Sequence, residues 1–298
     1  MLRSAKTTWS FFLVLVGSCL QLEAVAEDDV TFVFYNLRNY LAMNRTVDGE
    51  RLSSAPKPEK EIQPLIEGIK ATQPDILGVC EIGSPDYLED FKKRLADAGM
   101  DFPHTELLRG QGYDRNLAVL SKFPITESNS RDDYVYSLEG QEFPIGRGVL
   151  DVTVAISDEY PLRLIGLHLK SKRPVPMASE ADMRLNEARL ARQHIVKVVD
   201  KDRDINLLVF GDLNDMKHEA PVKAVKGRLG SNAYLTPLNL ADQYGFRWTH
   251  HWDFADSYAR IDFAMVSKGL SPEVDRASSR IHHWEDWDKA SDHRPLVV

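Results

Sequence analysis

The chain has 298 residues, of which 43% are hydrophobic, and a formal net charge of −8 at pH 7. This composition is that of a globular protein with a sizeable core, and it excludes a disordered or fibrous chain. The negative charge argues against a protein that wraps nucleic acid with a broad basic surface, although a local basic patch or a bound metal ion would still allow contact. The sequence shows no internal repeat, so we expect residues 27–298 to form one domain.

The first 26 residues have the layout of a secretory signal peptide. Arg3 and Lys6 precede an apolar stretch over residues 9–20, and residues 24–26 (Ala-Val-Ala) supply a small-residue cleavage site. An N-terminal membrane anchor is the alternative, which is disfavoured because the apolar run is short for a span. A lipid anchor on Cys19 is less favoured still, because its surroundings match a lipoprotein signal only loosely. We expect a secreted or periplasmic monomer without a transmembrane span in the mature chain.

Helices and strands intermix along the rest of the chain. Short apolar or alternating runs predict strands over residues 30–36, 76–81, 116–120, 148–156, 162–169, 207–210 and 261–266. Apolar residues spaced by three and four predict helices over residues 59–70, 85–98 and 179–199. Because several strands follow one another directly, we expect an α/β fold with sheets packed on each other and helices outside, rather than a doubly wound sheet.

The strand predicted at residues 207–210 leads into Gly211-Asp212-Leu213-Asn214. Residues two apart in a strand point to the same side, so Asp212 and Asn214 would face one reacting group if the strand continued past Gly211. The carboxylate would take a proton from water and the amide would orient that water. A simple turn at Asp-x-Asn is the alternative, and the motif alone leaves it open.

Polar residues of a few types stand at or beside the ends of other predicted strands. Such a recurrence indicates strands that converge on one cleft. Oxygen ligands suit Mg²⁺, which would polarise a phosphoryl oxygen, and a histidine held by an aspartate suits proton transfer. The pattern therefore favours hydrolysis of a phosphate ester. The residues are Asn36, Glu81, His168, Asp262, Asp292 and His293.

Taken together, these segments resemble the endonuclease/exonuclease/phosphatase superfamily. The resemblance implies a four-layer α/β sandwich of the DNase I type, in which two packed mixed β-sheets are flanked by helices. The matching segments follow the family's order and span most of the chain: Tyr35-Asn36, Val79-Cys80-Glu81, Leu117–Ile125, Leu167-His168, Gly211-Asp212-Leu213-Asn214, Arg260-Ile261-Asp262 and Ser291-Asp292-His293.

The resemblance also implies a metal site and contacts to the substrate. Glu81 would be the principal Mg²⁺ ligand, with Asn36 nearby and Asp292 as a further ligand; Mn²⁺ or Ca²⁺ are alternative ions. Arg147 is a candidate contact to phosphate. Lys170, soon after His168, would line the substrate groove, with a solvated loop as the alternative.

Five further residues would carry the chemistry in this resemblance. Asp212 would activate the attacking water, and Asn214 would position that water or the phosphate. His293, supported by Asp262, would contact the scissile phosphate. His168 would be a phosphate-side histidine.

We expect an Mg²⁺-dependent phosphodiesterase, with nucleic acid as the leading substrate. A sphingomyelinase-like enzyme or an inositol-phosphate phosphatase is the first alternative, and an inactive binding module on the same fold is a lesser one. Two departures disfavour a repair enzyme: Arg38 and His168 stand where the apurinic branch has an acidic residue and a tyrosine. A long aromatic hairpin would favour the lipid alternative, and the sequence shows none. The adjacent pairs His250-His251 and His282-His283 suggest a zinc site, but neighbouring residues of a strand face opposite ways and no cysteines accompany them, so a loop or surface position is favoured.

Overall fold

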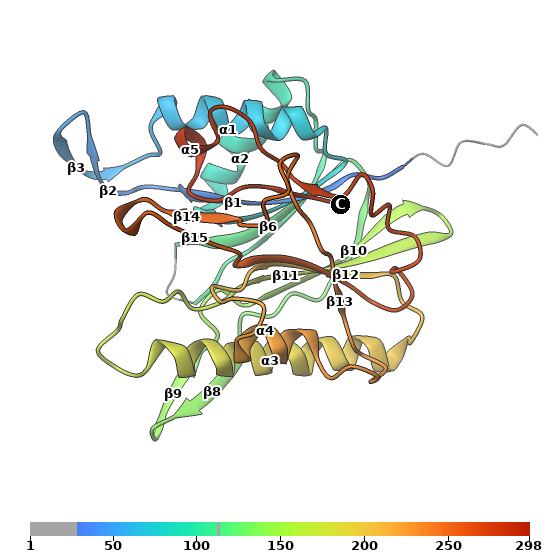
Figure 1. The fold of residues 1–298 in the computed structure, drawn as a ribbon. Coiled ribbons are helices and arrows are strands. Elements are labelled where there is room, and N and C mark those ends of the chain that lie inside the picture. The colour runs from blue at the N-terminus through green and yellow to red at the C-terminus, as the bar shows by residue number, and fades with distance from the viewer. Residues whose placement is uncertain (1–28, 112–113) are drawn as a thin grey trace, which may run out of the picture.

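The protein is described here by a computed structural model that covers residues 29–111 and 114–298. It has the four layers expected of the fold: helices, sheet, sheet, helices (Figure 1). The predicted signal peptide and Cys19 lie outside the described residues. Within them, no helix is both long enough and apolar enough to cross a membrane.

Two six-stranded sheets form the middle of the molecule. The first has the order β17-β18-β1-β4-β6-β5, and the second has the order β13-β16-β12-β11-β10-β7. Both are mixed, because β1 pairs with β4 and β11 pairs with β12 in parallel, while the other pairs are antiparallel. The strands of the first sheet are β1 (Phe32–Tyr40), β4 (Ile76–Ile82), β5 (His104–Leu108), β6 (Asn116–Ser121), β17 (Arg280–Ile281) and β18 (Leu296–Val297). Those of the second are β7 (Ile125–Ser128), β10 (Val149–Ser157), β11 (Tyr160–His168), β12 (Leu207–Asp212), β13 (Thr236–Pro237) and β16 (Asp262–Val266).

Helices cover the outer face of each sheet, and hairpins project from the layers (Figure 1). The first sheet is covered by α1 (Glu59–Thr72), α2 (Pro85–Asp97) and α5 (Trp287–Ala290), and the second by α3 (Glu180–Lys201) and α4 (Ala220–Lys226). The hairpins are β2 (Met43–Val47) with β3 (Glu50–Ala55), β8 (Val135–Leu138) with β9 (Gln141–Pro144), and β14 (His250–Trp252) with β15 (Ser257–Ala259) around a 3-10 turn at Asp253–Ala255.

The predicted elements are present, with ends that shift by one or a few residues. The long helix α3 begins where the sequence places it, because the Ser179 hydroxyl accepts a hydrogen bond from the Asp182 backbone N–H at 3.3 Å. It continues to Lys201, two residues beyond the expected end. Cys80 is buried in β4 as a small apolar residue would be, and it has no disulfide partner among the described residues.

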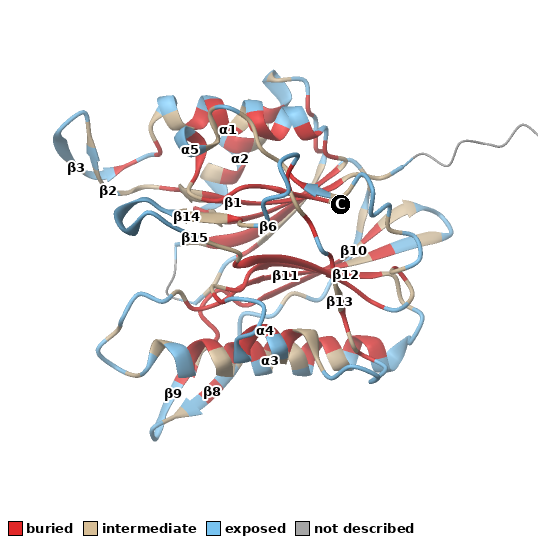
Figure 2. Cartoon of the chain, viewed as in Figure 1, coloured by how far each residue is buried: buried red, intermediate tan, exposed pale blue. Residues whose placement is uncertain are grey.

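Alternation along the strands divides the core into layers. Phe32, Phe34, Leu208 and Phe210 lie in the cluster between the two sheets, whereas the residues between them in β1 and β12 pack against the outer helices. Both sheets are therefore buried on both faces, and the helices are buried on one side only (Figure 2). This two-sided burial stabilises the sheets and leaves their strand ends as the place for polar groups.

The β14–β15 hairpin exposes large aromatic side chains. The exposed fraction is 55% for Trp252, 90% for Phe254 and 53% for Tyr258. The sequence did not indicate this feature. The hairpin is short, and each of its aromatic residues could equally well have packed under a loop. Scattered exposed apolar residues are ordinary, but three on one hairpin form a patch.

Candidate active site

The same alternation that builds the core places polar side chains at its open edge. Asn36 continues the inter-sheet side of β1, and Asp212 continues the inter-sheet side of β12. The two meet across the sheets, where Asn36 Nδ2 donates to Asp212 Oδ2 at 3.2 Å. Within the second sheet, Asp212 pairs in register with His168 on one side and with Asp262 on the other. The predicted convergence of these strand ends is thus present.

Glycine before Asp212 is required by the backbone. Gly211 has a φ of +145°, and a Cβ there would collide with the carbonyl oxygen of Leu167 on the neighbouring strand. The strand ends at Asp212, and Asn214 takes a left-handed φ of 52°. Strand geometry therefore stops before Asn214, and the condition that would put Asp212 and Asn214 on the same side of a strand is not met.

The turn interpretation of Asp-x-Asn is correct for the backbone. Asp212 Oδ1 accepts the Asn214 backbone N–H at 2.9 Å, and Asn214 Nδ2 donates to the Leu169 carbonyl at 3.0 Å. One oxygen of Asp212 therefore holds the turn while the other faces Asn36 in the cleft. Turn and site coexist in the same three residues.

A histidine held by an aspartate lies opposite Asp212. His293 Nδ1 is 2.8 Å from Asp262 Oδ2, and both side chains are buried. The other ring nitrogen, Nε2, faces the cleft at 3.4 Å from Asn36 Nδ2 and 3.9 Å from Asp212 Oδ2. Arg260, two residues before Asp262, donates instead to the carbonyls of residues 238 and 240.

Two hydroxyl groups that the sequence did not single out support this pair. Ser291 Oγ donates to the Asn36 carbonyl at 2.9 Å and accepts the His293 backbone N–H at 3.1 Å. Thr249 Oγ1 accepts the backbone N–H of Asp262 at 3.1 Å. Ser291 is part of the Ser-Asp-His motif and could have been found from it, whereas Thr249 carries no local signal.

Burial and charge set the protonation of the cluster. Burial, reinforced by the Asp262 carboxylate, raises the pKa of Asp212 well above its usual range. Burial alone would lower the pKa of His293, but the carboxylates of Asp262 and Asp212 outweigh it and raise that pKa. Burial, together with the positive charge of Arg147, lowers the pKa of His168 and favours the neutral ring. The cluster therefore combines a cationic and a neutral histidine.

Glu81, the last residue but one of β4, lies close to His168 of this cluster. Its φ is 63°, a left-handed conformation that costs a non-glycine residue roughly 1–3 kcal/mol. Oε2 accepts the Asn39 backbone N–H at 2.9 Å, and Oε1 lies 3.9 Å from His168 Nε2. Arg38 and Asn39 are left-handed as well. Such strain gathers at functional sites, which supports a role for Glu81.

Oxygen donors fit a divalent ion beside Glu81. The side chain of Glu81 is 16% exposed, so one carboxylate oxygen can reach an ion that keeps water ligands. Asn36 is less available as a metal ligand. Its Oδ1 accepts the Arg38 backbone N–H at 3.0 Å, and its Nδ2 faces Asp212. Asp292 is half-exposed, with Oδ1 3.9 Å from His293 Nε2 and Oδ2 3.7 Å from Arg38 Nε.

Arg147 and Lys170 lie beside the cluster, in the buried layer behind His168. Arg147 donates to the Leu169 carbonyl at 3.4 Å, and its charge reaches His168. The Lys170 ammonium donates to the carbonyls of residues 171 and 173, at 2.9 and 2.8 Å. Its backbone N–H donates to the buried carboxylate of Glu187 at 2.6 Å. The structure thus holds Lys170 in its own loop, and substrate contacts of both residues stay predictions.

His250 was expected in a loop or at the surface, and that expectation is wrong. It lies in β14 and forms an isolated bridge with His293, with ring centroids 4.7 Å apart. Its Nε2 is 3.9 Å from Asp292 Oδ2. The alternation rule does apply to its neighbour, since the His251 ring turns away and stacks on Tyr258 at 4.4 Å. No local pattern distinguishes the two histidines, because the packing of the hairpin decides which one faces the cleft.

Comparison with known proteins agrees with this geometry. The model of the endonuclease/exonuclease/phosphatase family matches residues 34–293. By sequence, the chain has no match among curated proteins. Among solved structures, it resembles sphingomyelinase C from Streptomyces griseocarneus, with a TM-score of 0.58 at 16% identity over 90% of this chain and 98% of that one.

Two further structures show the same fold. The human Nocturnin catalytic domain with bound sulfate has a TM-score of 0.60 at 17% identity, over 90% of this chain and 92% of that one. A beta toxin mutant from Staphylococcus aureus with bound magnesium ions has a TM-score of 0.57 at 14% identity, over 90% and 98%. Members of the matched family are hydrolases of phosphoester bonds that depend on divalent metal ions. With its motifs in order and its fold shared, this chain belongs to the endonuclease/exonuclease/phosphatase family.

Proposed function

We propose that this protein is a Mg²⁺-dependent phosphodiesterase that acts on nucleic acid. The observation that carries the proposal is the convergence of Asp212, His293 and Glu81 at one open edge between the sheets. Asp212 Oδ2 and His293 Nε2 are 3.9 Å apart and face the same space, while His293 is held from behind by Asp262. Such an arrangement can deprotonate a water on one side of a phosphate and donate to its oxygen on the other.

Asp212 is the proposed base. Its Oδ1 is fixed by the Asn214 N–H, which leaves Oδ2 for the attacking water. Asn36 Nδ2 donates to Asp212 Oδ2 at 3.2 Å and so orients the oxygen that meets the water. Asn214 acts in this proposal by shaping the turn, since its amide nitrogen is bound to the Leu169 carbonyl.

His293 is the proposed donor to the phosphate. Its Nδ1 bonds to Asp262, which fixes the ring orientation and leaves Nε2 to donate into the cleft. His168 has its Nε2 3.7 Å from Asp212 Oδ2, and we assign it to the opposite side of the phosphate. The positive charge of Arg147 behind His168 adds to the attraction for an anionic substrate.

Glu81 is the proposed principal ligand of Mg²⁺, with Asp292 as a further ligand. When bound, such an ion polarises a phosphoryl oxygen and offsets charge on the leaving group. The carboxylate of Glu81 is oriented for this by the Asn39 N–H and by the left-handed backbone at residue 81. Mn²⁺ or Ca²⁺ are the alternative ions.

The exposed hairpin favours a second candidate, a lipid phosphodiesterase. Trp252, Phe254 and Tyr258 stand on the hairpin whose other end carries His250 against His293. An aromatic patch beside a phosphate site suits either stacking on bases or contact with a lipid surface. One of the structural neighbours is a sphingomyelinase, which agrees with the second use.

A panel of esters tests the proposal and separates the candidates. We expect hydrolysis of plasmid DNA, RNA or bis(p-nitrophenyl) phosphate with Mg²⁺, and loss of it with EDTA. Asp212→Ala should lower turnover by about 10²- to 10⁴-fold, the usual contribution of a general base. Equal turnover of Asp212→Ala and the unaltered protein would refute the assigned base. Cleavage of sphingomyelin vesicles or inositol phosphates alone would move the substrate to the alternatives.

The hairpin can be tested in the same panel. Trp252→Ala together with Phe254→Ala should weaken cleavage of the macromolecular substrate and leave bis(p-nitrophenyl) phosphate unaffected. Leu229→Ala is a matched control, because Leu229 is 78% exposed and lies outside the hairpin. A loss on vesicles without a loss on DNA would favour the lipid candidate.

A further inference from the structure

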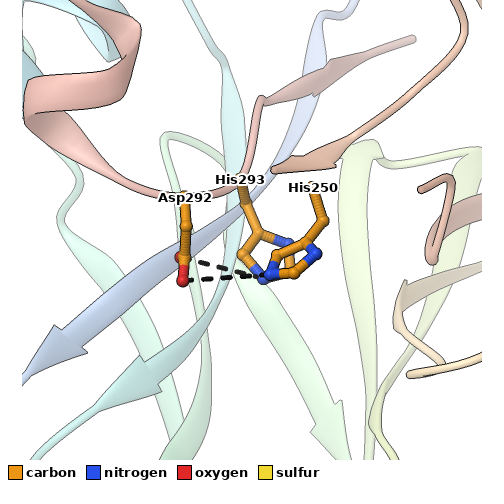
Figure 3. A group of neighbouring side chains, drawn as sticks. All are labelled: His250, Asp292 and His293. Atoms are coloured by element: carbon orange, nitrogen blue, oxygen red, sulfur yellow. Dashed lines mark ion pairs between the residues drawn. The ribbon is translucent and has the colours of Figure 1, made fainter. Parts of the chain in front are cut away.

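Three metal-ligating side chains from two segments meet at the candidate active site. They are His250 of β14, and Asp292 and His293 from the segment before β18 (Figure 3). His250 Nε2 lies 3.9 Å from Asp292 Oδ2, and His293 Nε2 lies 3.9 Å from Asp292 Oδ1. The ligand atoms of all three residues lie within 4.8 Å of one another.

Backbone hydrogen bonds hold the two segments together. The His251 N–H donates to the Asp292 carbonyl at 2.8 Å, and the Arg294 N–H donates to the Thr249 carbonyl at 2.7 Å. These bonds bracket the three side chains from both sides. The arrangement is therefore set by the backbone, and it does not depend on the side chains that would bind.

His293 can bind a metal ion through Nε2. Its Nδ1 bonds to Asp262, so Nε2 is the atom that points toward His250 and Asp292. A carboxylate that binds the far nitrogen of a metal-ligating histidine is the usual support in metal sites, where it orients the ring. Asp262 supplies that support here.

The donors favour a transition-metal ion over Mg²⁺. Two imidazoles and one carboxylate suit Zn²⁺ and related ions, whereas Mg²⁺ prefers oxygen ligands and water. Ligands that surround zinc tetrahedrally at about 2.0–2.1 Å lie about 3.3–3.4 Å from one another. The separations of 3.9 Å therefore need to close by only about half an ångström. A fourth position would remain open, as in catalytic zinc sites.

We propose that His250, Asp292 and His293 form a binding site for Zn²⁺ or a similar transition-metal ion. The inference goes beyond the proposed function: Zn²⁺ there would displace the proton from His293 Nε2 and occupy Asp292, so a bound ion and the assigned donor role of His293 exclude each other. His250 is the residue that distinguishes this site from the proposed Mg²⁺ site at Glu81. Ion binding itself needs no substrate, so it can be measured whether or not the esters of the panel are hydrolysed.

Calorimetric titration of the metal-free protein with Zn²⁺, followed by Co²⁺ absorption spectroscopy, tests the site. His250→Ala should weaken Zn²⁺ binding by more than about tenfold, since even outer partners of metal ligands contribute about 10- to 100-fold. Asp292→Asn should weaken it as well. The Co²⁺ spectrum should lose the bands of a low-coordinate nitrogen-ligated ion in both variants.

Two variants serve as controls. His251→Ala removes the neighbouring ring but keeps the backbone N–H that bonds Asp292, so Zn²⁺ binding should be retained. Glu81→Gln should likewise retain it, because Glu81 is not one of the three ligands. Circular dichroism of His250→Ala and of the milder His250→Asn checks that both fold. Unchanged Zn²⁺ affinity in His250→Ala, or a loss only in Glu81→Gln, would overturn the proposal.

Discussion

Two buried histidine–aspartate pairs of the described residues can be compared directly. His293 Nδ1 lies 2.8 Å from Asp262 Oδ2 at the open edge between the sheets. His194 Nε2 lies 2.6 Å from Asp151 Oδ2 on the outer face of the second sheet, under α3. In each pair the aspartate is within 1% of complete burial. By distance and burial alone, the two pairs look alike.

They differ in the partners of the remaining atoms. The second nitrogen of His194 meets the Tyr134 hydroxyl at 2.8 Å, and Asp151 accepts two bonds from Arg163 at 2.7 Å each. The second nitrogen of His293 instead faces the cleft. A closed network of satisfied polar groups rigidifies a fold, whereas a pair with one atom directed into a cleft can act on a ligand. The orientation of the second ring nitrogen therefore distinguishes a structural pair from a candidate catalytic one.

The largest expected difference in turnover is that between the His293 and the His194 variants. His293→Ala is expected to lower turnover by about 10²- to 10⁴-fold, because it removes the group assigned to donate to phosphate. His194→Ala should leave turnover per folded molecule unchanged. Steady-state rates on the best ester of the panel, measured below the unfolding temperature of each variant, check both. Comparable losses of turnover in both variants would contradict the assignment of one pair as catalytic and the other as structural.

The free energy of unfolding should depend strongly on the structural pair, Asp151 and His194. Asp151→Ala leaves the Arg163 guanidinium and His194 without their buried carboxylate, so we expect a loss of about 3–5 kcal/mol in the free energy of unfolding. Urea denaturation monitored by fluorescence measures this loss. A change below about 1 kcal/mol, as for an exposed ion pair, would contradict a structural role.

The aspartate of the cleft should affect rate more than stability. Asp262→Asn is expected to lower turnover by about 10- to 100-fold, since it weakens the orientation of His293. Its cost in stability should be small, because Asp262 lies in register with Asp212 and removing one charge relieves their repulsion. Asp151→Asn is the matched control and should keep its turnover. Rates and urea midpoints measured for both variants would show whether the pattern holds.

The smallest effect concerns acid stability. Burial alone would raise the pKa of Asp151, but the bonds from His194 and Arg163 outweigh it and hold that pKa below its usual value. A lowered folded pKa means that the stabilisation is present above the unfolded value of about 3.9 and is lost as the pH falls below it. The unaltered protein should therefore lose stability below about pH 4 more steeply than Asp151→Asn. Parallel pH profiles of the two unfolding free energies would argue against this source.

The sequence alone predicts most of the fold and much of the candidate site. Alternation in β1 and β12 is a local property with a period of two, so the placement of Asn36 and Asp212 on the inter-sheet side follows from the residues before them. The helices and the order of motifs follow from equally local patterns. The turn at Asn214 was an open alternative because a local motif supports both interpretations.

Tertiary packing decided what local patterns leave undetermined. His250 and His251 are adjacent and chemically identical, and only the pairing of β14 with the segment around His293 places one of them in the cleft. The Lys170 backbone N–H bonds to the Glu187 carboxylate of α3, and no short pattern around either residue predicts that contact. Periodicity shows which side of a strand a residue takes; the partners it meets there depend on contacts between residues far apart in the chain, which no short pattern encodes.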